Sequence, residues 1–261
     1  MCNPTGVDPR SIGGEVPLTH VSAVQPKFVV FDFGHTLVDF RRVPAALVDA
    51  YVTIREVLAS EISAELPGAE DLARQISDAI DVLVRTSYEE GRVAELDAVK
   101  LLTEAFAGIG VPLSRELARD LAVIDHQAFS NSISVPAPTL ATLQSLAERG
   151  LRLGLVSNIT LIPELLHADL DAMGLGPLFG GVAFSSEVGW RKPAPEFFEA
   201  LCRQVGVPAA ETALVGDDPV NDVEGAAAAG LSAVRFDARR EGPCREPACV
   251  SRLGELLDWF R

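Results

Sequence analysis

The chain has 261 residues, which suits one large domain or a core with a smaller insert. Hydrophobic residues make up 48% of the sequence, a content that argues against global disorder. The 22 basic and 37 acidic residues give a net charge of −15, which disfavours binding to nucleic acid or to a membrane, so an anionic substrate must be held locally.

The first segment, residues 1–25, contains Gly, Pro, Ser and Thr and has no apolar segment of the kind found in secretory signals. We predict a flexible N-terminal tail there. No run in the chain reaches the roughly 18 apolar residues that span a membrane, so a soluble protein is expected. The four cysteines are too few and too oddly spaced for a disulfide framework, which favours the reducing cytoplasm.

The stretch 27–38 opens with the apolar run FVVF, which is typical of a strand buried on both faces of a parallel sheet. Asp32 follows at once, where the carboxyl end of such a strand opens into the crevice that α/β sheets use for ligands. Gly34, His35 and Thr36 then form a tight polar turn. This pattern fits a nucleophilic aspartate followed by a phosphate-holding turn, but it also fits an aspartate that only ends a strand.

Residues 39–131 have a different character, because their apolar residues recur at helical spacing. Four amphipathic helices are predicted, with apolar stripes over 47–58, 72–83, 99–109 and 117–128. Ser114 is the expected N-cap of the last one, and the breaks fall at 67–68 and 110–112. These helices with no strand between them predict a small helical bundle inserted into the chain.

From Pro136 onward, apolar strand patterns alternate with helical ones. We predict strands at 151–156, 181–184, 212–215 and 233–236, and helices at 139–149, 162–173, 195–205, in an alanine-rich segment ending at Gly230, and at 250–260. Repeated strand and helix units predict an α/β fold, with a parallel sheet and helices on both faces. Near the end, Cys244 and Cys249 lack a second ligand pair, so two surface-loop thiols are favoured over a zinc site.

Six polar residues share one position in this pattern, at or just beyond the end of a predicted core strand. They are Asp32, Ser157, Asn158, Lys192, Asp217 and Asp222. Because the carboxyl ends of parallel strands meet at one edge, these residues are expected to form a single site. Converging carboxylates repel one another unless a hard cation or a lysine lies among them. Mg²⁺ suits oxygen ligands and phosphate substrates, and Asp32 and Asp217 are its natural pair.

Four short motifs occur in order along the chain. They are D-F-G-H-T-L at 32–37, S-N at 157–158, K-P at 192–193 and G-D-D-P-V-N-D at 216–222. Together they resemble the four motifs of the haloacid dehalogenase (HAD) superfamily. The resemblance implies a Rossmann-like core formed by residues 26–38 and 132–261, with an all-helical cap domain at 39–131.

The resemblance also implies a role for each motif residue. Asp32 would be the nucleophile that forms an aspartyl-phosphate. Thr36, Ser157 and Asn158 would belong to the catalytic set, with Thr36 and Ser157 holding phosphoryl oxygens, and Lys192 would balance charge. The implied Mg²⁺ ligands are Asp32, the carbonyl of Gly34 and Asp217, with Asp218 and Asp222 as supporting ligands.

One position departs from the pattern of the family's phosphatases. Most of them carry a second aspartate two residues after the nucleophile, as general acid and base, and here that residue is Gly34. Such a group is typically worth about 10² to 10⁴ in rate, so slow turnover of ordinary alkyl phosphates is expected. His35 is the nearest candidate to replace it, but a role in shaping the turn is favoured.

Three functions remain compatible with the sequence. The first is a Mg²⁺-dependent phosphatase or phosphotransferase acting on a small phosphorylated metabolite. The second is a hydrolase of another bond, of the dehalogenase or phosphonatase type, although Asp217 counts against a metal-free dehalogenase and Lys100 is the only lysine in the cap. The third is a catalytically weak binding or regulatory protein. Arg41 or Arg42 could hold a substrate anion, but surface arginines are favoured, and the oligomeric state is open.

Overall fold

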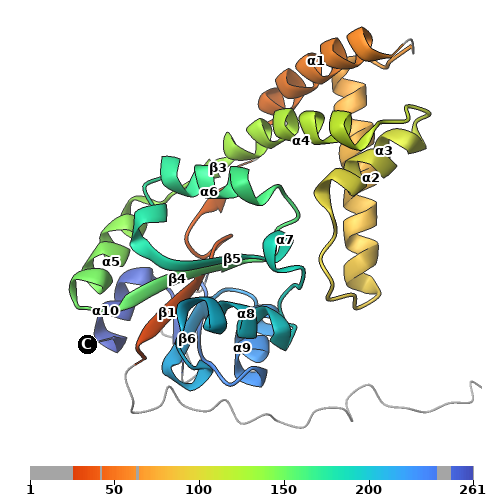
Figure 1. Cartoon of the computed structure of the whole chain (residues 1–261). Coiled ribbons are helices and arrows are strands. Elements are labelled where there is room, and N and C mark those ends of the chain that lie inside the picture. The colour runs from red at the N-terminus through yellow and green to blue at the C-terminus, as the bar shows by residue number, and fades with distance from the viewer. Residues whose placement is uncertain (1–25, 42, 63–64, 240–247, 261) are drawn as a thin grey trace, which may run out of the picture.

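The computed structural model describes residues 26–41, 43–62, 65–239 and 248–260. The predicted tail, Arg42 and Cys244 lie outside these residues. Figure 1 shows a core built around a sheet, with the helices of the predicted cap standing to one side of it. None of the described helices combines the length and the apolar character needed to cross a membrane.

The core sheet has six parallel strands in the order β5-β4-β1-β6-β7-β8. Their bounds are β1 (Phe28–Asp32), β4 (Arg152–Ser157), β5 (Phe179–Phe184), β6 (Thr212–Gly216), β7 (Ser232–Phe236) and β8 (Cys249–Val250). All five residues of β1 are buried, as expected for a strand with neighbours on both sides and helices on both faces. The predicted α/β class with a parallel sheet is confirmed.

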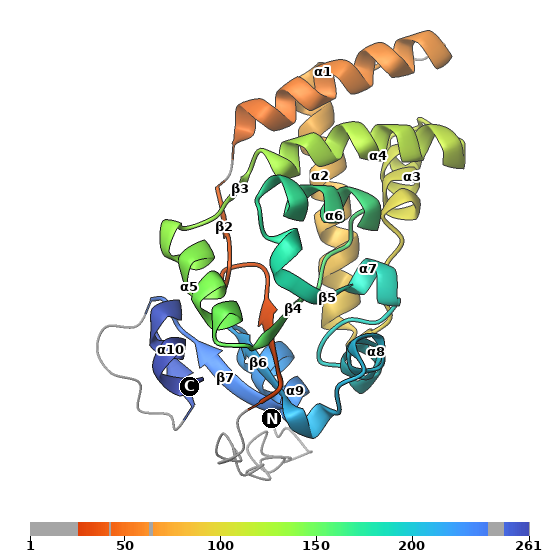
Figure 2. The same cartoon turned by 60° about the vertical axis from the view of Figure 1, so that its left-hand side comes forward.

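Alternate residues of β1 face two different hydrophobic clusters, because successive side chains of a strand point to opposite faces. Val29 and Phe31 pack in the cluster under α5 (Ala137–Glu148), α6 (Pro163–Ala172) and α10 (Leu256–Trp259). Phe28 and Val30 pack in the cluster under α8 (Pro195–Val205) and α9 (Gly225–Ala228). Figure 2 shows α5 and α10 on one side of the sheet and α8 and α9 on the other.

Short helical turns complete the core. They are α7 (Ser185–Val188), the 3-10 turns η1 (Gly176–Leu178), η2 (Ala209–Glu211) and η4 (Leu253–Glu255), and the π-helical turn η3 (Pro219–Glu224). The predicted helix over 250–260 is wrong in its first part, because Val250 is buried and pairs with Phe236 of β7. Cys249 is also buried in β8 and takes part in a disulfide, so it is not a surface-loop thiol.

The four predicted cap helices are present as α1 (Pro44–Glu61), α2 (Ala69–Glu89), α3 (Ala98–Gly108) and α4 (Arg115–Ser130). They enclose a hydrophobic cluster of their own, separate from the two clusters of the core. Ser114 caps α4 as predicted, because its hydroxyl accepts a hydrogen bond from the Leu117 N–H at 3.1 Å.

Two chain segments connect the cap to the core at one end. β2 (Asp39–Phe40) and β3 (Ile133–Ser134) pair as an antiparallel ribbon, with Phe40 opposite Ile133. The boundary predicted between residues 131 and 132 therefore places one strand of the ribbon in each domain. The exact domain limits stay a prediction.

The cap also touches the core far from this ribbon, through the loop between α2 and α3. The Arg191 N–H donates to the Val93 carbonyl at 2.7 Å, and the Glu95 N–H donates to Gly189 at 3.0 Å. The buried Arg191 guanidinium donates to the Ser87 hydroxyl at 2.6 Å and lies 4.1 Å from the ring centroid of Tyr88. The cap is thus held at this loop as well as at the ribbon, and α4 also meets α6, where Asp169 Oδ2 lies 2.9 Å from His126 Nε2 and Asp169 Oδ1 accepts from the Ser130 hydroxyl at 2.8 Å.

The buried carboxyl group of Asp125 on α4 makes the stability of the folded chain depend on pH. Burial raises the pKa of Asp125 to about 6, although a hydrogen bond from the Tyr51 hydroxyl acts in the opposite direction. The folded chain therefore binds this proton more tightly than the unfolded chain, and stability falls as the pH rises from about 4 to about 6. We expect Asp125→Asn to increase the free energy of unfolding by about 1–2 kcal/mol near neutral pH. Urea unfolding should show that Asp125→Asn gains less unfolding free energy at about pH 5 than near neutral pH. Equal gains at the two pH values would contradict a raised pKa of Asp125 in the folded chain.

Candidate active site

Parallel pairing brings the ends of three core strands to one edge of the sheet. Asp32 of β1 lies opposite Val156 of β4, so Ser157 follows one residue beyond it. Phe31 lies opposite Val215 of β6, which places Asp217 just past the same edge. Oxygen atoms of Asp32, Asp217 and Asp222 all lie within 4.8 Å of one another.

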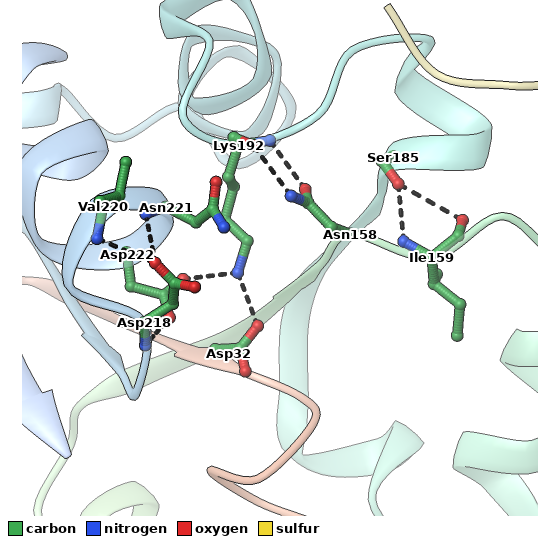
Figure 3. Close-up of polar contacts among 9 residues, drawn as sticks. All are labelled: Asp32, Asn158, Ile159, Ser185, Lys192, Asp218, Val220, Asn221 and Asp222. Atoms are coloured by element: carbon green, nitrogen blue, oxygen red, sulfur yellow. Dashed lines mark hydrogen bonds and ion pairs between the residues drawn. The ribbon is translucent and has the colours of Figure 1, made fainter. Parts of the chain in front are cut away.

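Lys192 lies between two of these carboxylates. Its ammonium donates to Asp32 Oδ1 and to Asp222 Oδ1, each at 2.6 Å, and all three side chains are buried (Figure 3). Burial acts to lower the pKa of Lys192, but the carboxylates of Asp32 and Asp222 outweigh it and hold that pKa above its ordinary range. The lysine is therefore a fixed positive charge beside the proposed nucleophile.

The acidic cluster carries more negative charge than one lysine can balance. Burial raises the pKa of Asp32 to about 7 against the pull of Lys192, and the nearby Asp222 and Asp217 carboxylates add to the rise. Burial and Asp222 also raise the pKa of Asp217. These groups resist ionising together, and a bound divalent cation would offset that repulsion.

Asn158 positions Lys192 through the main chain. Its side-chain oxygen accepts from the Lys192 N–H at 2.7 Å, and its side-chain nitrogen donates to the Lys192 carbonyl at 2.9 Å (Figure 3). These two hydrogen bonds fix the orientation of the Asn158 amide against the backbone of Lys192. Ser157 and Asn158 both line the cavity beside Asp32.

The loop after β6 is built around Asp222 and Asp218. Asp222 Oδ2 accepts from the Asp218 N–H at 2.9 Å, and Asp218 Oδ1 accepts from the N–H groups of Val220 and Asn221 at 2.8 Å. A Cβ at Gly216 would lie 2.4 Å from the Asp222 carboxyl group, so only glycine fits there. Both oxygens of Asp222 therefore accept protein hydrogen bonds, which suits positioning of Lys192 better than direct metal binding.

The structure does not bring Thr36 to this site. Thr36 is buried, its hydroxyl has no hydrogen-bond partner among the described residues, and it lines a different cavity of about 510 Å³ beside Phe236 and Leu253. The phosphate-holding role of Thr36 stays a prediction. His35 does line the cavity at Asp32, in a left-handed backbone conformation with φ of 59°.

Gly34 lies against an aromatic ring from the ribbon. A Cβ at this position would be 2.8 Å from Cε2 of Phe40, so a larger residue here needs the ring to move. Phe40 is itself in contact with His35 and Phe129, at centroid distances of 5.6 and 5.7 Å. The place beside the nucleophile is therefore filled by Phe40.

A cavity of about 480 Å³ lies between the core site and the cap. Sequence reasoning did not identify the residues on its cap side, which are Phe40, Ile80, Val84, Tyr88, Leu101 and Phe129. One sequence feature could have identified three of them: residues 80, 84 and 88 are spaced four apart on one helix, so they share a face of α2. Lys100 and Arg41 are exposed and do not line this cavity.

Comparison with known proteins identifies the family. A family model described as haloacid dehalogenase-like hydrolase matches residues 26–230. The chain belongs to the haloacid dehalogenase-like hydrolases. It is 33% identical over 234 residues to a phosphoglycolate phosphatase of Rhodospirillum rubrum, an alignment that covers 88% of this chain and 86% of that protein.

A second relative matches over a shorter segment. The chain is 39% identical over 122 residues to a phosphoserine phosphatase of Thermus thermophilus, which covers 46% of this chain and 47% of that protein. This haloacid dehalogenase-like chain thus aligns with about half the length of that relative. Family membership and the phosphatase relatives together indicate a hydrolase.

Solved structures of the same family share the fold. A 2-haloacid dehalogenase from Pseudomonas syringae pv. tomato has a TM-score of 0.61 at 23% identity, over 89% of this chain and 97% of that one. A HAD phosphatase from Thermococcus onnurineus has a TM-score of 0.57 at 24% identity, with the same coverages of 89% and 97%. These likenesses confirm a HAD-type core with a cap domain and do not choose between the two chemistries.

Proposed function

We propose that this chain is a Mg²⁺-dependent phosphatase or phosphotransferase that acts on a small phosphorylated molecule through an aspartyl-phosphate on Asp32. The observation that carries the proposal is the buried Asp32 carboxylate, 2.6 Å from the Lys192 ammonium and grouped with Asp217 at the mouth of a cavity. The phosphatase relatives support the same reaction class.

The donor set fits a hard divalent cation, because carboxylate oxygens from Asp32 and Asp217 converge, Asp217 adds to the raised pKa of Asp32, and Asp222 adds to the raised pKa of Asp217. These two residues would hold Mg²⁺ together with the carbonyl of Gly34, which also lines the cavity. When bound, Mg²⁺ would supply charge neutralisation for the phosphoryl oxygens. Asp222 and Asp218 would support the site by fixing Lys192 and the loop.

The reaction proceeds in two displacements on the residues of this chain. A carboxylate oxygen of Asp32 bonds to phosphorus while the bond from phosphorus to the leaving oxygen breaks, and the electron pair departs with that oxygen. Lys192 and the hydroxyl of Ser157 stabilise the charge that develops on the phosphoryl group. Water then attacks the aspartyl-phosphate, loses a proton to solvent and regenerates the Asp32 carboxylate with inorganic phosphate. Transfer to an alcohol in place of water would give a phosphotransferase.

Phosphate release from p-nitrophenyl phosphate tests the metal requirement. We expect release with Mg²⁺, none with EDTA, and an Mg²⁺ concentration for half-maximal rate that Asp217→Asn raises at least about tenfold. Thermal unfolding supplies a second readout, because Mg²⁺ should raise the Tm of the wild type more than that of the variant. A rate that is the same in EDTA and in Mg²⁺ would remove the metal from the proposal.

A further inference from the structure

The cavity beside Asp32 has two halves of different chemistry. The core half carries the acidic cluster, Lys192, Ser157 and Asn158. The cap half is formed by apolar and aromatic side chains from three helices and the ribbon. They are Phe40, Ile80, Val84, Tyr88, Leu101 and Phe129. A phosphoryl group seated at Asp32 would direct its leaving group toward this second half.

Two of the rings on the cap side are unusually open for their size. Tyr88 is 45% exposed and Phe40 is 37% exposed, although both lie at the wall of the cavity. Apolar surface left open in a cavity of about 480 Å³ is the usual composition of a small-molecule site. Covering these rings with an apolar ligand group would remove that surface from water.

The charges on the described residues around the cavity disfavour an anionic leaving group. Among the described residues that line it, Lys192 is the only lysine or arginine, and both Asp32 and Asp222 already bind its ammonium. Arg191 lies behind Tyr88, where its guanidinium donates to Ser87 and to the Arg92 carbonyl. A carboxylate on the substrate would therefore rest against apolar side chains without a lysine or arginine from the described residues, which weakens its binding.

The cap half also lacks a group that readily protonates a leaving oxygen. Among the described residues that line the cap half none carries a carboxyl or imidazole group, and Phe40 fills the space next to Gly34. The imidazole of His35 belongs to the core half, where its ring lies against Phe40 at a centroid distance of 5.6 Å. An oxygen that leaves without receiving a proton must come from an acidic alcohol. Phenols, with a pKa of about 10, are far more acidic than water at about 15.7. Polarity and leaving-group chemistry thus point to the same kind of molecule.

We infer that the preferred substrate is an aryl phosphate monoester whose ring carries no second anionic group, with the ring lying against Tyr88, Val84 and Phe129. This inference rests on the proposed function and names its substrate class. The phosphorylated carboxylic acids that give two of the relatives their names fall outside that class.

A matched substrate series tests this inference with the full-length protein and Mg²⁺. We expect kcat/KM for phenyl phosphate to exceed that for para-carboxyphenyl phosphate at least about tenfold, since the two differ mainly by one remote charge. Cyclohexyl phosphate, which is apolar but has a poor leaving group, should fall at least about a hundredfold below phenyl phosphate. Phosphoglycolate carries a carboxylate and has an alkyl leaving group of low acidity, so it should be the poorest substrate.

Two lysine substitutions on α2 provide a matched pair. Val84→Lys places a cation in the cap half and should raise the ratio of para-carboxyphenyl to phenyl phosphate turnover at least about tenfold. Val82 is 48% exposed on the same helix and does not line the cavity, so Val82→Lys should leave the ratio unchanged. A ratio that does not respond to Val84→Lys would overturn the assignment of this wall.

The results of these experiments test the substrate class and the phosphatase activity separately. Asp32-dependent turnover of phosphoglycolate or para-carboxyphenyl phosphate at the rate of phenyl phosphate would refute the substrate class and leave the phosphatase activity standing. Lack of Asp32-dependent phosphate release from every member of the series would overturn both.

Discussion

Asp32→Asn is expected to lower phosphate release at least about 10³-fold, because the amide cannot form the acyl phosphate that the first displacement requires. The substitution keeps the size of the side chain, and its oxygen can still accept from the Lys192 ammonium. It also removes one of three crowded carboxylates, so the folded chain in EDTA should be at least as stable as the wild type.

Phosphate release and thermal unfolding should be measured on the same preparations of this variant. Asp81→Asn is the matched control, since Asp81 is an exposed carboxylate on α2 away from the cavity and its loss should change neither quantity. Wild-type turnover by Asp32→Asn would show that another group attacks phosphorus. A large loss of Tm would instead mean that the carboxylate is needed for folding.

Lys192→Met should be the most damaging substitution for stability in this site. It leaves Asp32 and Asp222 buried and without their cation, and breaking a buried pair in this way costs about 3–5 kcal/mol. Activity should fall at least about 10²-fold, because the fixed charge next to the phosphoryl group is lost.

The control for Lys192→Met is the same change at an exposed ion pair. Lys27 is 70% exposed and binds Glu211 at 2.8 Å, and Lys27→Met should cost less than about 1 kcal/mol. Urea unfolding in EDTA measures both variants without help from a bound cation. Similar losses for the two variants would contradict the view that burial makes the Lys192 pair important.

The sequence was most informative where one local pattern determines one structure. The FVVF run predicted β1, and the parallel sheet that follows from strand and helix alternation brought Asp32, Lys192 and Asp217 to one edge. That these residues meet could be predicted without any knowledge of side-chain contacts. It followed from the rule that parallel strands end on the same side.

The sequence was least informative where packing between distant segments decides. Thr36 belongs to a recognisable motif, but that motif does not indicate the second cavity that Thr36 lines beside Phe236 and Leu253. Phe40 and Tyr88 carry no motif, and only the pairing of β2 with β3 and the placement of α2 against the core make them cavity residues. The segment over 250–260 has a helical pattern, but its first residue, Val250, pairs with Phe236 of β7 and is part of a strand.

The ribbon and the loop around Glu95 hold the cap at opposite ends of the cavity. Thr160 donates to Glu95 at 2.8 Å, and Ser185 also donates to that carboxylate, while Arg191 lies over the Tyr88 ring, so the loop end is attached by non-covalent contacts. The ribbon end is attached through the covalent chain. Any separation of the cap from the core must break these bonds to Glu95 and also the contacts that His126 and Ser130 of α4 make with Asp169 of α6.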